Sequence, residues 1–166
     1  MVGEEVAQGG VEAGGDHGVF TGQKTYNGVA IVSRHPIDAV QKNNPLFEDE
    51  QQRIIAATIA GMRIICAYVP NGQAVDPEKY PYKLSWLAAL RDWVKAEMEQ
   101  HPQLALLGDY NIAPDDRDVH DPAAWEGMNL VSPPERAAFQ ALLDLGLSDS
   151  FRQFEQAEKT FSWWDY

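Results

Sequence analysis

The sequence is short of cysteine, of positive charge and of long apolar runs, and each shortage excludes a class of protein. Cys66 is the only cysteine, so no disulfide can form within the chain and a disulfide-stapled scaffold is excluded. We expect Cys66 to serve as a small buried hydrophobic residue of a strand rather than as a reactive thiol. No apolar stretch approaches the roughly 18 residues that a membrane-spanning helix needs, so we expect no membrane association.

Basic residues are outnumbered, with 13 Lys and Arg against 25 Asp and Glu and a formal net charge of −12 at pH 7. This balance argues against a basic nucleic-acid-binding module, because Lys and Arg neutralise phosphates and supply most non-specific affinity for DNA. It argues less against a metal-dependent nuclease, in which a divalent ion offsets carboxylates locally. The acidic runs Glu48-Asp49-Glu50 and Asp115-Asp116-Arg117-Asp118 are expected to be solvated loops.

The N-terminal residues Met1-Val2-Gly3-Glu4-Glu5 are acidic and contain glycine, whereas a secretion signal has a basic start and an apolar core. We therefore expect a cytoplasmic protein. No internal repeat, low-complexity tract or break in composition marks a second domain.

Runs of β-branched residues predict strands. Gly28 to Ser33 is predicted to be a buried strand, and Arg53 to Ala60 with Met62 to Val69 is predicted to be a hairpin that turns at Gly61. The apolar run that starts at Leu104 predicts a further strand.

Two segments have helical patterns. Apolar residues recur at helical spacing from Tyr80 to about Gln100, at Leu84, Leu87, Leu90 and Val94, which predicts an amphipathic helix packed on a sheet. A capping-box pattern at Ser132-Pro133-Pro134-Glu135 predicts a second helix that ends near Gly146. Strands mixed with helices in this way indicate a layered α+β domain.

The strand from Leu104 ends in Gly108-Asp109-Tyr110-Asn111, an acid and an amide two residues apart. Because successive side chains of a strand point to opposite faces, we expect Asp109 and Asn111 to project to the same side. An acid beside an amide can deprotonate a nucleophile and donate a hydrogen bond to developing negative charge. The residues alone leave a plain turn equally open, since Gly-Asp and Asn-x-x-Pro also punctuate loops.

Six segments in order resemble the exonuclease III family of AP endonucleases, within the endonuclease/exonuclease/phosphatase superfamily. They are Gly22-Gln23-Lys24-Thr25-Tyr26-Asn27-Gly28-Val29-Ala30-Ile31, Arg53-Ile54-Ile55, Ala67-Tyr68-Val69-Pro70-Asn71-Gly72, Gly108-Asp109-Tyr110-Asn111-Ile112-Ala113-Pro114, Pro134-Glu135-Arg136 and Phe161-Ser162-Trp163-Trp164-Asp165-Tyr166. The resemblance implies a partial four-layer α/β/β/α sandwich of the superfamily's type over residues 11–166. It leaves residues 1–10 as a poorly matched segment that we expect to be disordered.

The resemblance covers only the central portion of the family's pattern. The family's first strand with its Asn, its Gln-Glu-Thr segment with a metal-binding Glu, its Arg-Ile-Asp strand and its Ser-Asp-His segment have no counterpart in this sequence. The four histidines lie in no comparable motif. We therefore expect this chain to be catalytically incomplete.

The activity that the resemblance implies is metal-dependent hydrolysis of phosphodiester bonds at abasic sites in duplex DNA, with 3′-5′ exonuclease and 3′-phosphatase activity. The implied cofactor is Mg²⁺ or Mn²⁺, and the implied partner is duplex DNA with abasic or 3′-blocked sites. No obligate protein partner is evident. Two alternatives stay open: another phosphoesterase of the same superfamily, and an inactive or assembly-dependent fragment.

The resemblance assigns catalytic roles to three residues. Asp109 is expected to activate or orient the attacking water, and Asn111 and Tyr68 are expected to stabilise the charge that develops on the phosphate. Asp109 and Asn111 are expected to form at most part of a metal site, because the main carboxylate ligands have no counterpart here. By residue type alone, a tyrosine at a strand end such as Tyr68 is more often a half-buried packing residue.

Three further residues are expected to bind substrate by the same resemblance. Asn71 is similar to a phosphate-contacting residue, and Trp163 belongs to the segment that walls the pocket for a flipped-out abasic sugar. Such a nucleotide is extruded cheaply because little stacking is lost. Tyr26 is a candidate DNA-facing aromatic. A core position remains the alternative for Trp163.

Overall fold

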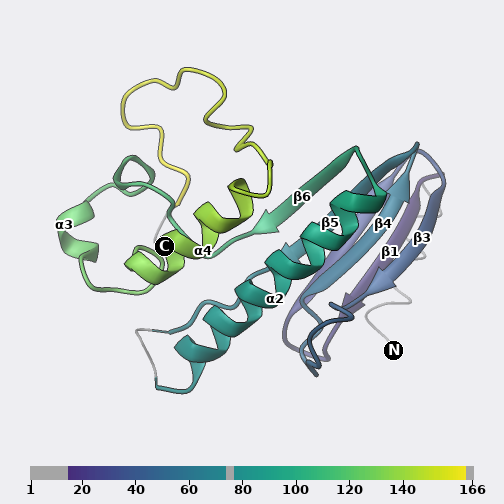
Figure 1. Ribbon diagram of the computed structural model, residues 1–166, viewed down its shortest axis with the longest axis horizontal. Helices are drawn as coiled ribbons and strands as arrows, with labels where there is room; N and C mark the ends of the chain where they lie inside the picture. Colours follow the sequence, from purple (N-terminus) through teal and green to yellow (C-terminus); the bar gives the residue numbers. More distant parts are fainter. Residues whose placement is uncertain (1–14, 74–76, 164–166) are drawn as a thin grey trace. The chain divides into compact units, whose positions relative to one another are not determined.

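The computed structural model describes residues 15–73 and 77–163, so the predicted disordered segment 1–10 lies outside the described residues. The elements, labelled in Figure 1, are β1 (His17–Gly22), β2 (Gly28–Ser33), β3 (Ile37–Lys42), β4 (Ile54–Ile59), β5 (Met62–Tyr68), α2 (Lys79–Gln100), β6 (Leu104–Asp109), the 3₁₀ helix η1 (Asp116–Asp118), α3 (Pro122–Trp125) and α4 (Pro133–Leu143). This mixture confirms the predicted α+β class.

The chain forms two compact units. The first contains the described residues up to Val69 together with Asp92–Tyr110. The second contains Pro70–Arg91 and the described residues from Asn111 onward. Helix α2 starts in the second unit and ends in the first.

The first unit contains a four-stranded sheet of order β3-β4-β5-β6 and a two-stranded sheet of β1 and β2. All its strand pairs are antiparallel except β5 with β6, which are parallel. The β4–β5 hairpin turns at Ala60 and Gly61, whose φ angles are 49° and 84°. Positive φ at both central residues is the requirement of a type I′ turn, so the predicted hairpin at Gly61 is confirmed.

One hydrophobic cluster of the first unit lies between its two sheets. Ile31 of β2 packs with Ile55 and Ala57 of β4, and Cys66 of β5 lies at the edge of this cluster. Burial raises the pKa of the Cys66 thiol, against a smaller opposing effect of a hydrogen bond with the Ala30 backbone, which suits the expected apolar role. The last part of α2 covers the opposite face of the four-stranded sheet, so three layers result (Figure 1).

Strand β2 has the predicted bounds but is not buried as predicted. Ile31 is 7% exposed, whereas Val32 on the other face is 54% exposed. A two-stranded antiparallel sheet that packs through one face leaves its other face to solvent, so alternate residues of β2 stay accessible.

Gly108 marks a close approach between β5 and β6. It pairs with Ala67, and its φ is +136°. A Cβ built on Gly108 would lie 1.9 Å from the carbonyl oxygen of Ala67. Only glycine therefore fits at the position immediately before Asp109.

Helix α4 of the second unit has the predicted start, whereas α3 was not predicted. Ser132 Oγ accepts from the Glu135 N–H, and the Glu135 carboxylate accepts from the Ser132 N–H, as the capping box requires. Helix α4 ends at Leu143, three residues before the predicted end, and Gly146 closes a turn by donating to the Leu143 carbonyl at 2.8 Å. Helix α2 begins one residue before the predicted start.

Within the described residues, no helix combines the length and the apolar character that crossing a bilayer demands.

We expect Gly108→Ala to be far more destabilising than Gly61→Ala. The second change adds only the left-handed backbone penalty of about 1–2 kcal/mol, since nothing lies within 4 Å of its Cβ. The first adds a clash with backbone that cannot move without breaking the β5–β6 pairing. Urea unfolding of both variants measures this difference, and equal losses would contradict the close approach.

Candidate active site

Tyr68 and Asp109 lie beside each other in the first unit. They are register partners at the carboxyl ends of the parallel strands β5 and β6, and the Val69 N–H donates to the Asp109 carbonyl at 2.9 Å. Asp109 is exposed and Tyr68 is half-buried. The carboxyl ends of parallel strands are where ligands bind in open α/β sheets, so this pair has the placement of site residues.

Arg53 orients Tyr68. Its guanidinium lies 4.8 Å from the centroid of the Tyr68 ring, and Nη1 donates to the Tyr68 carbonyl at 3.2 Å. Arg53 Nε also donates to Gln51 Oε1 at 2.7 Å. Arg53 belongs to one of the segments that resemble the family, but its contact with Tyr68 was not predicted. The two residues are 15 positions apart, and the β4–β5 pairing brings them together.

The loop that carries Tyr26 joins β1 to β2. Tyr26 is 75% exposed, and its neighbours Thr25 and Asn27 have positive φ. Asn27 fixes the loop by donating to Gln23 Oε1 at 2.9 Å and to Gln51 Oε1 at 3.2 Å. An exposed aromatic on an anchored loop is available to a ligand, and its predicted role in binding DNA stays a prediction.

In the second unit, Asn71 and Asn111 contact each other through their side chains. Asn71 Nδ2 donates to Asn111 Oδ1 at 3.1 Å. The expectation that strand alternation extends to Asn111 is wrong, because β6 ends at Asp109 and Asn111 has a left-handed φ of 46°. Asn129 continues the chain of amides, since its Nδ2 donates to Asn71 Oδ1 at 2.9 Å.

A buried ion pair between Lys83 of α2 and Glu135 of α4 contacts the backbone of Asn71 and Asn111. Both side chains are fully buried. Lys83 Nζ donates to Glu135 Oε1, to the Asn111 carbonyl at 2.6 Å and to the Asn71 carbonyl at 3.1 Å. Glu135 also accepts from the Leu130 N–H at 3.0 Å and from Ser132 Oγ at 2.6 Å. Both charges are therefore compensated and hydrogen-bonded.

Sequence reasoning missed Lys83 although the signal was present. Residues 83, 87, 90 and 94 recur with helical spacing, and Leu87, Leu90 and Val94 are buried. A lysine in that buried stripe needs a counter-ion, because an isolated buried charge is too costly. The predicted capping-box residue Glu135 is that counter-ion.

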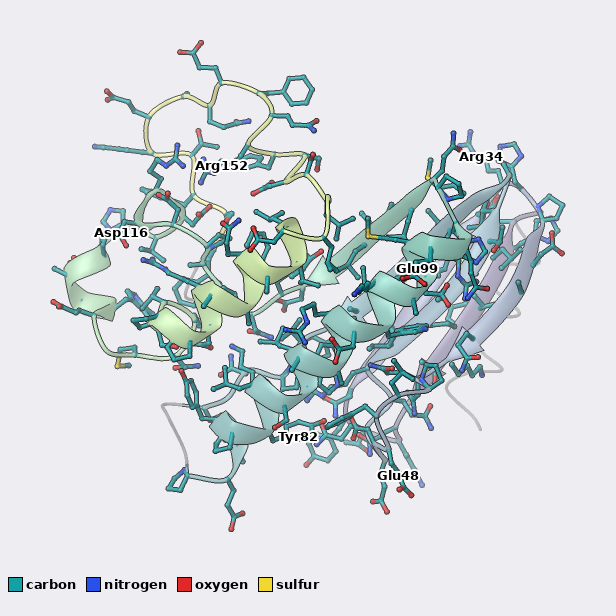
Figure 2. All side chains as sticks on the ribbon, viewed as in Figure 1. Arg34, Glu48, Tyr82, Glu99, Asp116 and Arg152 are labelled. Carbon is teal, nitrogen blue, oxygen red and sulfur yellow. The ribbon has the colours of Figure 1, made fainter. Side chains whose placement is uncertain are left out.

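The acidic run before α3 is only partly the solvated loop that we expected. Glu48 of the other run does project into solvent (Figure 2). Asp118 instead is buried, and it accepts from Arg152 at 2.6 Å and from Ser162 Oγ at 2.6 Å. The pattern of charges could not distinguish Asp118 from its neighbours, since its partners come from much later in the chain.

Trp163 is half-buried beside α3. Its ring lies edge-on to Trp125 with centroids 4.4 Å apart, and its backbone N–H donates to the Asp118 carbonyl at 3.2 Å. These contacts fit the alternative of a packing residue as well as the wall of a pocket, and the predicted substrate role stays a prediction.

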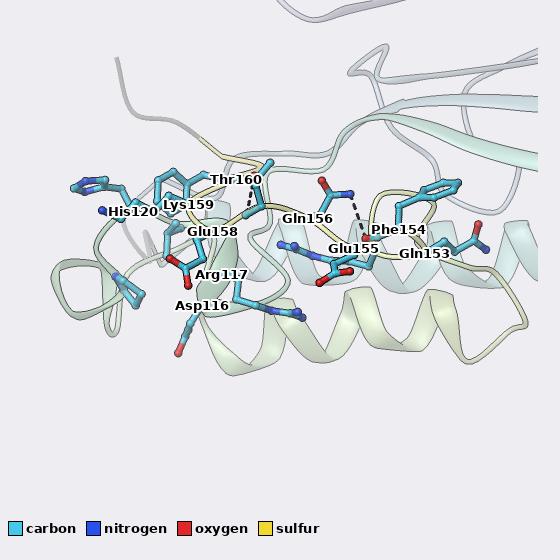
Figure 3. Close-up of a pocket in the computed structure, with 15 residues that line it drawn as sticks. Asp116, Arg117, His120, Gln153, Phe154, Glu155, Gln156, Glu158, Lys159 and Thr160 are labelled. Carbon is cyan, nitrogen blue, oxygen red and sulfur yellow. Dashed lines mark hydrogen bonds between the residues drawn. The ribbon is translucent and has the colours of Figure 1, made fainter.

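A cavity of about 850 Å³ opens in the second unit between the loop from Arg152 to Phe161 and the η1–α3 segment (Figure 3). Charges of both signs line it, among them Asp116, Arg117 and Lys159. None of the predicted site residues belongs to its lining. The cavity therefore does not locate the chemistry.

The described residues do not assemble a metal site on their own, since no three His, Cys, Asp or Glu among them are grouped to hold an ion. Asp109 and Asn111 were predicted as a partial site only. We therefore derive no reaction step through a metal ion from these residues.

A model of the Endonuclease/Exonuclease/phosphatase family matches residues 4–166. Among curated proteins, the chain is 33% identical over 165 residues to the exodeoxyribonuclease III of Haemophilus influenzae, covering 92% of this chain and 62% of that protein. It is 30% identical over 146 residues to an exodeoxyribonuclease of Bacillus subtilis, covering 87% and 57%. The chain thus spans 62% and 57% of the length of these two relatives.

Solved structures of exonucleases and AP endonucleases also resemble this chain. The 3′-5′ exonuclease NExo from Neisseria meningitidis matches with a TM-score of 0.92 and 48% identity, over 96% of this chain and 62% of that one. An AP endonuclease from Archaeoglobus fulgidus matches with a TM-score of 0.89 and 33% identity, over the same shares. A Neisseria 3′ phosphatase bound to a product DNA hairpin matches with a TM-score of 0.86 and 50% identity, over 88% and 57%.

Removing one partner of the buried ion pair should cost much more than removing both. Lys83→Met leaves the Glu135 carboxylate buried without its cation, which we expect to lower the free energy of unfolding by about 3–5 kcal/mol. The double variant Lys83→Met/Glu135→Gln removes both charges and should recover part of that loss. Urea denaturation checks this, and additive losses would show that the two groups are not coupled.

Arg117 controls the ionisation of Asp115. The hydrogen bonds and charge of Arg117 lower the pKa of the Asp115 carboxyl to about 2 from an ordinary 3.8. Because the folded pKa is depressed, the stabilisation is present above about pH 4 and is lost as the pH falls through about 2. It is small, since solvent screens the exposed pair.

We expect Arg117→Ala to raise the Asp115 pKa toward 3.8, measured by carboxyl ¹³C NMR titration. Arg136→Ala, which removes the 2.8 Å partner of Asp116, is the control and should leave the Asp115 pKa unchanged. An unchanged pKa in Arg117→Ala would contradict the assignment.

Proposed function

The chain belongs to the endonuclease/exonuclease/phosphatase family, and from this we propose that it is a DNA-repair nuclease of the exonuclease III type. The observation that carries the proposal is the pairing of Tyr68 with Asp109 at the carboxyl ends of β5 and β6. The relatives named as exonuclease, AP endonuclease and 3′ phosphatase support the choice of reaction. We place the activity in the cytoplasm.

The proposed substrate is duplex DNA that contains an abasic site or a blocked 3′ end. The proposed reaction is hydrolysis of a phosphodiester or a terminal phosphate ester. The relative whose structure holds a product DNA hairpin supports DNA as the ligand class. Another phosphoesterase activity and an inactive fragment remain the alternatives that the experiment below separates.

Three side chains of this chain carry the proposed chemistry. The Asp109 carboxylate accepts a hydrogen bond from the attacking water and takes its proton, which a carboxylate near a phosphate can do as a general base. The Tyr68 hydroxyl donates to a phosphate oxygen, and Arg53 keeps the ring in one orientation. The Asn111 amide donates to the charge that develops on the phosphate.

Nucleases of this family are metal-dependent in general, and we propose Mg²⁺ or Mn²⁺ as the ion. Oxygen ligands suit either ion, so Asp109 and Asn111 are the residues of this chain that contribute to such a site. The described residues do not complete it. We accordingly propose that this chain alone holds part of the catalytic set and has little or no activity by itself.

The experiment is incision of a labelled duplex with one abasic analogue or one 3′-phosphate, in Mg²⁺ and in EDTA. Asp109→Asn keeps the shape of the side chain and removes its charge, so any incision should fall by about 100-fold or more. Asp38→Asn, a change of an exposed acid in β3, is the matched control and should leave the rate unchanged.

Metal-dependent incision that Asp109→Asn abolishes would support the nuclease and overturn the proposed incompleteness. If the folded chain does not incise the duplex, its affinity for damaged and for intact DNA tests the proposal. Tighter binding of the damaged duplex than of an intact duplex, weakened by Tyr68→Phe, would support the proposal. Neither incision nor preferential binding would contradict it, and hydrolysis of an inositol phosphate would favour the other phosphoesterase.

A further inference from the structure

Among the described residues of the second unit, the Lys83 ammonium donates to three acceptors. They are the Glu135 carboxylate and the backbone carbonyls of Asn71 and Asn111. An ammonium has three N–H groups and no acceptor, so these three bonds use its whole capacity. Lys83 is also fully buried. It therefore cannot serve as a direct phosphate ligand, and its effect on any substrate passes through the two asparagines.

The conformation of Asn111 allows its contact with Lys83. Asn111 adopts a left-handed φ of 46°, which costs free energy for a residue with a Cβ. In this conformation its carbonyl lies 2.6 Å from Lys83 Nζ. A hydrogen bond from a charged donor is about twice as strong as a neutral one, so it offsets the backbone cost.

The side-chain amides are ordered in one direction. Asn129 donates to Asn71 Oδ1 at 2.9 Å, and Asn71 Nδ2 donates in turn to Asn111 Oδ1 at 3.1 Å. Asn129 also donates to the Asn71 carbonyl at 3.1 Å. The oxygen of the Asn111 amide thus accepts from Asn71, and the nitrogen is the donor of that amide. A phosphate oxygen accepts hydrogen bonds only, so this is the polarity that phosphate recognition requires.

We propose that Lys83 and Asn129 are positioning residues that fix Asn71 and Asn111 in one mutual orientation for binding a phosphate group. Lys83 binds the backbone carbonyls of Asn71 and Asn111, and Asn129 fixes the orientation of the Asn71 side-chain amide. Glu135 neutralises Lys83 so that no net charge is buried. This inference rests on the proposed function, in which the two asparagines contact the phosphate of the substrate.

The first test uses the double variant Lys83→Met/Glu135→Gln in the whole chain. The amide that Glu135→Gln introduces retains an acceptor for the Leu130 N–H and supplies a donor to Ser132 Oγ, and Ser132 Oγ still accepts from the backbone N–H of residue 135. Only the Ser132 N–H loses its acceptor, so the cap of α4 is kept in part. We expect the side-chain amide NMR signals of Asn71 and Asn111 to shift and their hydrogens to exchange about tenfold faster. The Asn27 amide, which donates within the first unit, is the internal reference.

The matched control is Arg63→Met/Glu97→Gln, which removes an ion pair between β5 and the last part of α2, with a 2.5 Å contact in the first unit. It should leave the Asn71 and Asn111 signals unchanged. Asn129→Leu is the second variant; it keeps the ion pair and removes the amide donor. If the Lys83 double variant does not fold, Asn129→Leu decides the test.

The second measurement is the affinity for a duplex that ends in a 3′-phosphate. We expect the Lys83 double variant and Asn129→Leu to bind about tenfold more weakly than the wild-type chain, and the Arg63 control to bind equally. Unchanged amide signals, or shifted signals with unchanged affinity, would overturn the positioning role while wild-type binding upholds the proposed function. A wild-type chain that binds no damaged duplex would overturn both.

Discussion

The second unit depends on one fully buried ion pair. Lys83 and Glu135 bring together the first part of α2, the start of α4, the turn at Asn71 and the loop at Asn111. Each charge would be prohibitively costly alone in an apolar interior, and each becomes acceptable because the other neutralises it and further hydrogen bonds satisfy both groups. A fold built in this way tolerates little change at either residue, because the carbonyls of the two asparagines share the same lysine.

The first unit depends in the same way on a steric constraint between two strands. The parallel strands β5 and β6 approach so closely at Ala67 and Gly108 that no side chain fits at position 108. The same pairing places Tyr68 beside Asp109 one residue later. Close packing of the two strands thus requires the glycine of the Gly-Asp-Tyr-Asn segment. The same strand pairing fixes the position of Asp109, which follows that glycine.

Sequence reasoning succeeded where the signal is local. The hairpin at Gly61 follows from a glycine that accepts positive φ between two strand-like runs, and the start of α4 follows from a serine and a glutamate three residues apart. It failed where the partner is distant. The burial of Asp118 depends on Arg152 and Ser162, and the orientation of Tyr68 depends on Arg53. The alternation rule failed at Asn111 because a strand pattern carries no information about where the strand ends.

The sequence by itself determined strands β2, β4, β5 and β6, helices α2 and α4 and the family to which the chain belongs, because periodicity, capping and motifs are properties of neighbouring residues. Only the tertiary structure decided how the polar residues are used. Lys83 falls in the apolar stripe of α2, but its counter-ion is identified only when Glu135 is found beside it, and Asn129 has no visible role until it contacts Asn71. The physical reason is that a buried charge or amide is stable only with its partners, and those partners lie up to 58 residues away along the chain.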